Sequence, residues 1–142
     1  MIWKEKYRIG VEQIDKQHEE LFQRVTSFVE MLRAPMEWSE KVGKVNDTLA
    51  FMQDYVVTHF RDEEEYQKQI GYTDLVKHVK IHTDMVAYVG DFAVQYEKTG
   101  YNEQLVQQFG GKLLAWLINH VTFEDQRIAD YARRKAEADY EQ

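Results

Sequence analysis

The feature that most constrains the fold is a stripe of apolar and histidine positions in the middle of the chain. Its members step by three and four residues, the spacing of the buried face of a packed helix: Leu75, His78, His82, Met85, Val89, Phe92 and Tyr96. The two histidines lie about one turn apart, so both imidazoles project from the same side of the helix. Because a buried imidazole needs a partner for each ring nitrogen, the pair suggests a bound metal.

Three further stretches show this spacing, the last with one interruption, and the first two end near Pro35 and Gly71. Their inward positions are His18, Leu21, Val25, Phe28 and Leu32; then Val42, Val45, Leu49, Met52, Val56, His59, Glu63, Tyr66 and Ile70; then Phe109, Leu113, Trp116, His120, Asp125, Ile128 and Ala132. We expect helices capped by Asp15, Ser39, Thr73 or Asp74, and Asn102, ending near Arg33, Ile70, Thr99 and Ala136. Short connections between long helices predict an all-α, antiparallel up-down-up-down four-helix bundle.

The chain is expected to form one domain over residues 1–142. Residues 1–14 lack a helical period and predict an N-terminal arm that packs along the bundle, with Trp3 as a packing anchor. Residues 15–136 would form the bundle itself. Residues 137–142 would be a charged tail that frays.

The fourth stripe slips by one residue between His120 and Asp125. In a regular helix of about 3.6 residues per turn, Asp125 would point about 140° away from His120. One extra residue, as in a π-bulge, would return Asp125 to the inner face, and such bulges favour functional sites. The sequence therefore predicts a local helix distortion within residues 120–125.

Composition excludes several classes of function. The formal charge of −7 argues against a nucleic-acid partner and against an anionic membrane surface. The absence of cysteine excludes disulfides, iron–sulfur clusters and thiol chemistry. The charged opening segment does not look like a signal peptide, and no run of about 18 apolar residues is present. A cytoplasmic location is the expectation.

Seven polar side chains fall on the four inward stripes, and they include all five histidines of the chain: His18, His59, Glu63, His78, His82, His120 and Asp125. If both acids bridge, the set suits two metal ions, dividing the histidines three and two and leaving one coordination position open. Imidazole and carboxylate ligands suit iron, zinc, copper or manganese. Each piece alone is weak, because histidine pairs occur on helix surfaces and Glu64 and Glu65 are expected to be a solvated acidic run. Their convergence favours a dinuclear metal site.

With this ligand set, the chain resembles the hemerythrin family, specifically the single-domain bacteriohemerythrins. The matching segments, in order, are Ile14-Asp15-Lys16-Gln17-His18, then His59 to Glu63 (HxxxE), His78 to His82 (HxxxH) and His120 to Asp125 (HxxxxD). The resemblance covers nearly the whole chain and leaves no ligand position unfilled. It implies a non-haem di-iron centre, bridged by oxide or hydroxide, that binds O2 reversibly for oxygen transport, storage or delivery.

The same resemblance assigns a role to each ligand and to a pocket. His78, His82 and His120 would bind a six-coordinate iron, His18 and His59 the iron with the open position, and Glu63 and Asp125 would bridge. In the family, O2 binds end-on at the open iron, and release reverses every step. Reversible binding needs an apolar lining that keeps water away. The matching pocket positions are Leu21, Phe60, Trp116, Leu117 and Val121, each of which could equally be plain core packing.

The sequence leaves other functions open. The domain could be a sensor that reports O2 or redox state to a signalling partner, or it could handle iron or nitric oxide. An enzyme is disfavoured, because ferritin-like di-iron enzymes use carboxylate-rich sites with Glu-x-x-His motifs, whereas histidines here outnumber acids five to two. The expected partners are O2 and an unidentified O2-consuming or signalling protein, with no nucleic acid and no membrane.

Overall fold

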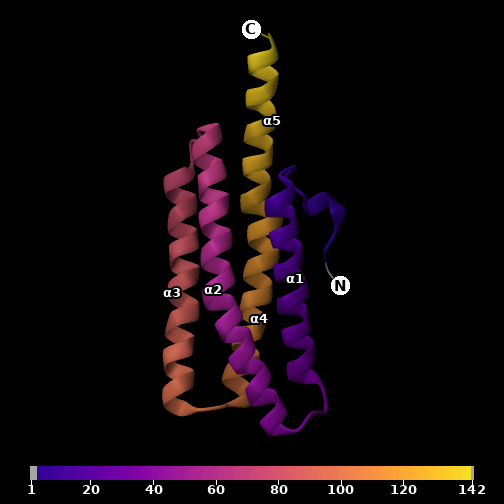
Figure 1. Ribbon diagram of the computed structural model, residues 1–142, viewed down its shortest axis with the longest axis vertical. Helices are drawn as coiled ribbons and strands as arrows, with labels where there is room; N and C mark the ends of the chain where they lie inside the picture. Colours follow the sequence, from indigo (N-terminus) through magenta and orange to yellow (C-terminus); the bar gives the residue numbers. More distant parts are fainter. Residues whose placement is uncertain (1–2, 142) are drawn as a thin grey trace.

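Four long helical rods make up the molecule. The computed structural model describes residues 3–141, and no β-strand occurs among them. The first three rods are α1 (Glu12–Arg33), α2 (Trp38–Ile70) and α3 (Leu75–Thr99). The fourth rod runs through α4 (Glu103–Asn119), η2 (His120–Glu124) and α5 (Asp125–Glu141) without a break (Figure 1). Successive rods run antiparallel, which confirms the predicted all-α four-helix bundle.

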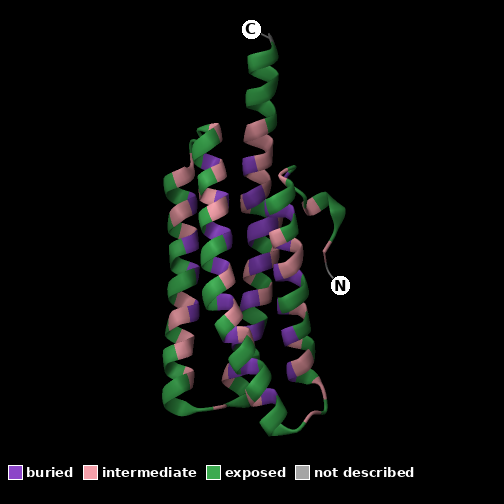
Figure 2. Cartoon of the chain, in the orientation of Figure 1, coloured by how far each residue is buried: buried purple, intermediate pink, exposed green. Residues whose placement is uncertain are grey.

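The apolar stripes of the sequence face the bundle axis. Figure 2 shows buried residues along the inner sides of the rods and exposed residues outside. On α1 every member of the predicted stripe, from His18 to Leu32, is buried. α1 packs against both α2 and α4, while α3 packs against α2. The rods therefore enclose one continuous core, and its polar residues lie in the same interior as its apolar ones.

Three of the predicted helix signals act as expected. Gly71 ends α2 in the left-handed conformation, with φ +69°, which glycine adopts without a steric penalty. Gly100 follows α3. Asn102 caps α4, because its side-chain oxygen accepts a hydrogen bond from the Leu105 amide at 3.1 Å.

The predicted start of the first helix is wrong. α1 begins at Glu12 and not after Asp15. The Asp15 carboxylate lies inside the first turn, where it accepts hydrogen bonds from the amides of Ile9 at 2.7 Å and Gly10 at 3.2 Å. Asp15 therefore binds the arm that precedes the helix. Because the helix starts three residues before Asp15, this residue marks the helix start too late in the sequence.

Two other cap predictions also need correction. α2 begins at Trp38, ahead of the predicted cap Ser39. Asp74 precedes α3, but its carboxylate makes no capping hydrogen bond. It accepts one from Arg127 of α5 at 2.8 Å, so a contact between rods has replaced a contact within the helix.

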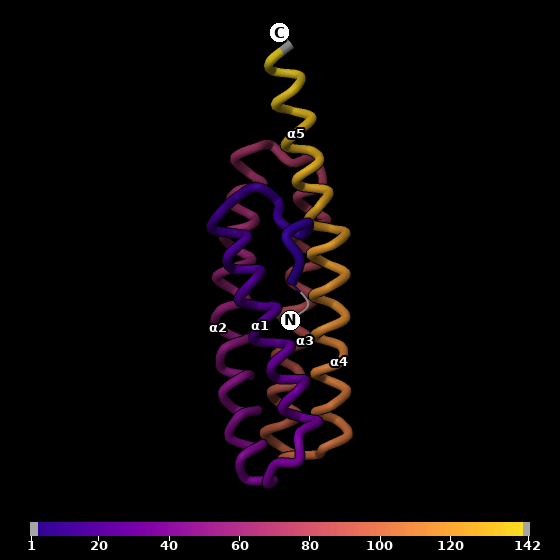
Figure 3. Tube along the Cα trace, turned by 90° about the vertical axis from the view of Figure 1, so that its right-hand side faces the viewer, coloured from indigo at the N-terminus to yellow at the C-terminus, as the bar shows by residue number. Residues whose placement is uncertain are grey.

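The arm lies beside α1 and the fourth rod (Figure 3). Trp3 packs edge-on against Tyr7 and Phe22, with ring centroids 5.7 and 5.5 Å apart. The carbonyl oxygen of Tyr7, at the end of the short helix η1 (Glu5–Tyr7), accepts a hydrogen bond from Gln126 at 2.8 Å. Trp3 is thus a packing anchor, as expected. Residues 1–2 of the predicted arm lie outside the described residues.

The fourth rod is longer than predicted. α5 continues to Glu141, past the expected end at Ala136, and projects beyond the other rods (Figure 1). The residues after Tyr131 include the strong helix formers alanine, arginine, lysine and glutamate. Neither glycine nor proline, which would end a helix, occurs there. An ion pair between Arg133 and Asp130, at 2.9 Å, adds support along the helix. Gln142 lies outside the described residues.

The predicted distortion of the fourth rod is confirmed. Residues His120–Glu124 form a π-helix between two regular α-helices. The extra residue turns Asp125 back to the interior, where its side chain is fully buried. Within residues 3–141, none of the helices has the combination of length and apolarity needed to cross a membrane.

Candidate metal centre

All four rods deliver polar side chains to one layer of the core. His18 comes from α1, His59 and Glu63 from α2, His78 and His82 from α3, His120 from η2 and Asp125 from the first residue of α5. None of these seven residues is more than 2% exposed. The structure thus brings together every residue that the sequence marked as a candidate ligand.

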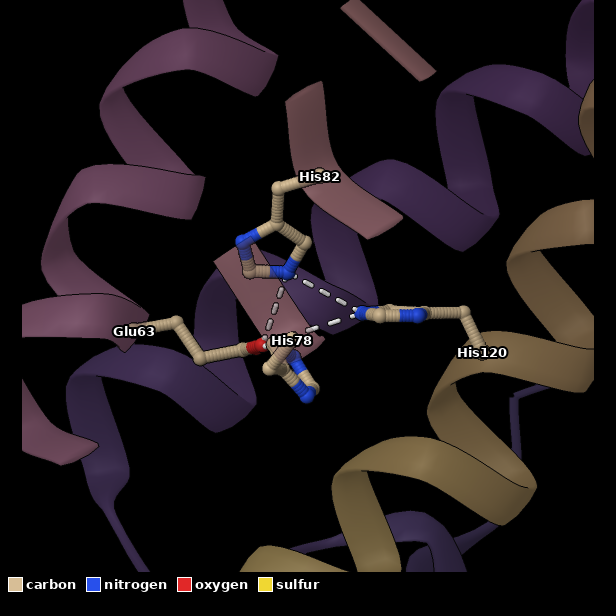
Figure 4. A group of neighbouring side chains, drawn as sticks. All are labelled: Glu63, His78, His82 and His120. Carbon is tan, nitrogen blue, oxygen red and sulfur yellow. Dashed lines mark hydrogen bonds and ion pairs between the residues drawn. The ribbon is translucent and has the colours of Figure 1, made fainter. Parts of the chain in front are cut away.

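Glu63 divides its two carboxylate oxygens between two groups of histidines. Oε2 lies 3.0 Å from Nε2 of His18 and 3.4 Å from Nε2 of His59. Oε1 lies 2.7 Å from Nε2 of His78 and 3.2 Å from Nε2 of His82. Figure 4 shows His78, His82 and His120 turned toward this second oxygen. One carboxylate therefore faces both a two-histidine group and a three-histidine group.

Asp125 repeats the division from the opposite rod. Its Oδ2 lies 3.1 Å from Nε2 of His18, and its Oδ1 lies 3.2 Å from Nε2 of both His78 and His120. Although both oxygens are buried, neither makes a hydrogen bond among the described residues. Buried polar atoms without hydrogen bonds are rare. The Asp125 oxygens and the neighbouring histidine nitrogens face one common region, as ligands of a shared ion do.

The donor atoms fit two metal ions. Glu63 groups with His78, His82 and His120, and separately with His18 and His59, and in each group the ligand atoms lie within 4.8 Å of one another. Ligands about 2.1 Å from one ion lie roughly 3–4 Å from each other, so these spacings suit metal binding. The three-and-two division equals the one expected from the sequence, and Asp125 reaches both groups.

Partners on neighbouring helices hold two of the imidazoles from outside. Nδ1 of His59 lies 2.7 Å from Oε1 of Gln17, and Nδ1 of His82 lies 2.7 Å from Oε2 of Glu64. The expectation that Glu64 belongs to a solvated acidic run is therefore wrong, because its carboxylate turns inward to α3. Sequence reasoning missed both partners. Their only signal was adjacency, since Gln17 precedes His18 and Glu64 follows Glu63.

Aromatic side chains fix the orientation of two ligand rings. Phe60 lies flat against His82, with ring centroids 3.8 Å apart and planes 1° apart. Trp116 lies against His120 at 4.4 Å and 11°. The rings therefore have little freedom to turn away from the centre.

Protons balance the buried carboxylates when no metal is bound. Burial lowers the pKa of an imidazole, but the carboxylates of Asp125 and Glu63 outweigh it and raise the pKa of His18 and His78 to about 9 and that of His120 to about 10. Burial, together with the charge on nearby His18, lowers the pKa of His59 to about 3.

The carboxylates shift in the complementary direction. Burial raises the pKa of Glu63 and of Asp125, but contacts with the imidazolium groups, His120 foremost, outweigh burial and lower both pKa values below their usual range. Several protons thus supply the positive charge that the two acids require. Metal ions must displace those protons to bind.

A small apolar cavity borders the centre. The volume in which the centre of a water-sized molecule can lie is about 10 Å³. The cavity therefore holds about one such molecule. Its walls are Leu21, Val25, Met52, Val56, His59, Phe60, Met85, Leu113, Trp116, Leu117, His120 and Val121. All five side chains proposed as pocket lining lie on it. Sequence reasoning missed Val25, Met52, Val56 and Leu113 as lining and treated Met85 as core. These residues lie further along the same inward stripes.

Known proteins resemble this chain over most of its length. A family model described as the hemerythrin HHE cation binding domain matches residues 9–132. Bacteriohemerythrin from Clostridium acetobutylicum is 26% identical over 91% of this chain and 98% of its own length. Bacteriohemerythrin from Stenotrophomonas maltophilia is 26% identical over 94% of this chain and 82% of its own length. Myohemerythrin from Theromyzon tessulatum is 28% identical over 87% of this chain and 86% of its own length. The matched domain and the converging His and Glu ligands agree with the predicted di-iron cofactor, and the chain belongs to the hemerythrin family.

Proposed function

We propose that this chain binds O2 reversibly at its di-iron centre and serves to carry, store or deliver oxygen. The proposed ligands are His18, His59, Glu63, His78, His82, His120 and Asp125. The observation that carries the proposal is the division of both carboxylates between a three-histidine group and a two-histidine group, beside a small apolar cavity. Each acid can thereby hold two ions at once.

The protein contributes fixed positions and a dry environment. When bound, the iron pair would supply the redox chemistry through which O2 binds reversibly. Glu63 and Asp125 keep the two histidine groups at a fixed separation, and Phe60 and Trp116 hold two of the rings in place. Because these contacts exist before any ligand enters, little rearrangement is needed when O2 binds.

The cavity borders both histidine groups, because its wall includes His59 of the two-histidine group and His120 of the three-histidine group, and every other lining residue is apolar. We place O2 at the two-histidine group because it has one histidine fewer and so leaves a coordination position open. Side chains such as Leu21 and Leu117 offer neither a proton nor a hydrogen bond. A lining of this kind excludes water, which would otherwise promote irreversible oxidation.

The donor set supports a binding protein and not an enzyme. Five histidines and two acids surround the centre, unlike the carboxylate-rich sites of ferritin-like di-iron enzymes. The relatives named above are likewise called hemerythrins. A cytoplasmic location, and a protein partner that consumes O2, stay predictions.

One observation favours sensing as a second candidate function. Asp125, a proposed ligand, is the first residue of α5, and the last turns of α5 project beyond the other rods (Figure 1). A change at the centre could therefore be transmitted along one rigid helix. Hydrogen exchange of residues 126–141, compared between deoxygenated and oxygenated protein, distinguishes the two functions. A carrier would show no change in α5, and a sensor would show altered protection there.

Optical spectroscopy of the iron-loaded protein tests the main proposal. The protein is reduced, exposed to air, deoxygenated under argon and exposed to air again. A carrier gains visible absorption in air, loses it under argon and regains the same amplitude over several cycles. The matched variants are Asp125→Asn, which alters a proposed bridge, and Asp130→Asn, which removes an acid of the same helix outside the centre.

The expected results separate the variants. Asp130→Asn should cycle like the unmodified protein, while Asp125→Asn should hold fewer than two ions and fail to cycle. A single irreversible spectral change in the unmodified protein would contradict reversible binding. Full cycling by Asp125→Asn would contradict the proposed bridge.

A further inference from the structure

The two imidazoles that have outer partners are held by groups of different charge. His82, in the three-histidine group, lies 2.7 Å from the carboxylate of Glu64. His59, in the two-histidine group, lies 2.7 Å from the amide oxygen of Gln17. The hydrogen bonds are equally short, so they differ in the charge of the acceptor and not in length.

The geometry fixes which nitrogen carries the proton. Nε2 of His82 lies 3.2 Å from Glu63, and Nε2 of His59 lies 3.4 Å from the same side chain, so in both rings Nε2 faces the centre. Nδ1 of each ring faces the outer partner. A nitrogen that binds metal carries no proton, so Nδ1–H is the donor in both hydrogen bonds.

The two acceptors are themselves held differently. Gln17 donates from Nε2 to Asp62 at 2.8 Å, which fixes its amide so that the oxygen faces His59. Glu64 makes no second hydrogen bond or ion pair with any side chain among residues 3–141. Its side chain is 24% exposed, so water only partly screens it. Its negative charge therefore acts mainly on His82.

We infer that Glu64 is a positioning residue that makes His82 a stronger electron donor than His59, so that the three-histidine group retains its metal and favours the more highly charged ion. The physical reason is that an anionic acceptor draws the Nδ1 proton outward and raises the basicity of the ligating nitrogen. A neutral amide does so less. The inference rests on the proposed function, because it assumes that these histidines bind iron.

Substitutions of Glu64 and of its neighbour Glu65 test this inference. Glu64→Gln keeps a hydrogen-bond acceptor but removes the charge, and Glu64→Ala removes both. Glu65→Gln is the matched control, since Glu65 is exposed and removal of its charge alters the same segment of α2. Two quantities are measured on iron-loaded protein: the rate of iron release to a chelator and the reduction potential of the iron pair.

The expected results follow the strength of the outer partner. Glu64→Ala should release iron about tenfold faster or more, and Glu64→Gln should lie between it and the unmodified protein. Both should have a higher reduction potential, because a weaker donor stabilises the ferric state less. Glu65→Gln should match the unmodified protein in both measurements, and circular dichroism of all metal-free variants should be unchanged.

Two outcomes would overturn the inference. One is equal shifts in Glu64→Gln and Glu65→Gln, which would mean that only the general charge of the segment matters. The other is an unchanged release rate and potential in Glu64→Ala. Failure of the unmodified protein to bind two iron ions would instead refute the proposed function, and it is measured before any variant is compared.

Discussion

At the scale of single residues, the buried acids dominate the behaviour of the metal-free protein. Glu63 and Asp125 are fully buried, and unpaired carboxylates in such a place would be strongly destabilising. Protonated His18, His78 and His120 compensate them. In the metal-free protein, the same side chains that would bind metal therefore stabilise one another through bound protons.

The first prediction is that metal-free protein loses stability as the pH rises. The pKa values of His18, His78 and His120 are raised from 6.5 to about 9, 9 and 10. Their contribution is fully present below 6.5 and is lost as the pH rises through these values. The free energy of unfolding should thus fall by several kcal/mol between pH 6.5 and 10, measured by denaturant titration.

Two checks accompany this prediction. Below pH 6.5 the lowered pKa of His59 makes the free energy of unfolding fall as the pH falls. The reason is that His59 then binds a proton in the unfolded chain but not in the folded chain. Iron-loaded protein should show no comparable fall above pH 6.5, since metal has replaced the protons. A flat or rising stability of the metal-free protein between pH 7 and 9 would contradict the charge assignment.

The second prediction concerns the lining of the cavity. Leu117 is 4% exposed and lines the cavity, whereas Leu114 packs against the core away from it. Leu117→Asn should accelerate autoxidation of oxygenated protein at least several-fold, because a polar group stabilises water beside the centre. Leu114→Asn is the matched control and should oxidise at nearly the normal rate. The decay of the visible absorption measures both rates, and equal rates would show that the cavity lining does not control autoxidation.

At the scale of elements, the α1–α4 contact depends on the absence of a side chain at one position. A Cβ atom added at Gly110 would lie 3.1 Å from Leu32 Cδ1 and 3.3 Å from the Phe28 ring, both on α1, whereas one added at Gly111 would meet nothing within 4 Å. Gly110 is buried and Gly111 is exposed. The two adjacent glycines therefore differ in packing and not in helix propensity.

The third prediction compares alanine at these two positions. Gly111→Ala should stabilise the protein by about 0.5–1 kcal/mol, the usual gain within a helix. Gly110→Ala should give a smaller gain or a loss, because Leu32 and Phe28 must move. Denaturant unfolding of both variants measures the difference. Equal gains would show that α1 and α4 are less tightly packed here than described.

Much of the element level could be predicted from the sequence. Strict three-and-four spacing locates all four rods, and the extra residue between His120 and Asp125 locates the π-helix. The start of α1 could not be predicted, because Asp15 resembles a cap in sequence and acts from inside the helix. Gln17 and Glu64 were missed for a similar reason. Which neighbour a polar side chain chooses depends on contacts between helices, which spacing along one helix does not contain.

At the scale of the whole molecule, the proposed ligands join all four rods at one level. Each rod contributes at least one residue to the same buried layer. Ions bound there would link segments as distant in sequence as His18 and Asp125. Because the unfolded chain cannot present these ligands together, metal binding adds directly to the stability of the fold.

The fourth prediction is that iron removal lowers the melting temperature without abolishing the helices. Iron-loaded and metal-free protein should both unfold in one cooperative transition, as expected of a single domain, with the loaded form melting at a higher temperature. Circular dichroism at 222 nm follows both. Identical melting temperatures would mean that the metal lies outside the core. A disordered metal-free chain would show that the apolar core alone is insufficient.

The central claim is that two iron ions share one buried layer with seven side chains from four rods. Anomalous diffraction at the iron absorption edge from crystals of the loaded protein tests it most directly. We predict two separate iron peaks, one among His78, His82 and His120 and one beside His18 and His59, with Glu63 and Asp125 contacting both. A single peak, or peaks bound to surface carboxylates away from these histidines, would contradict it.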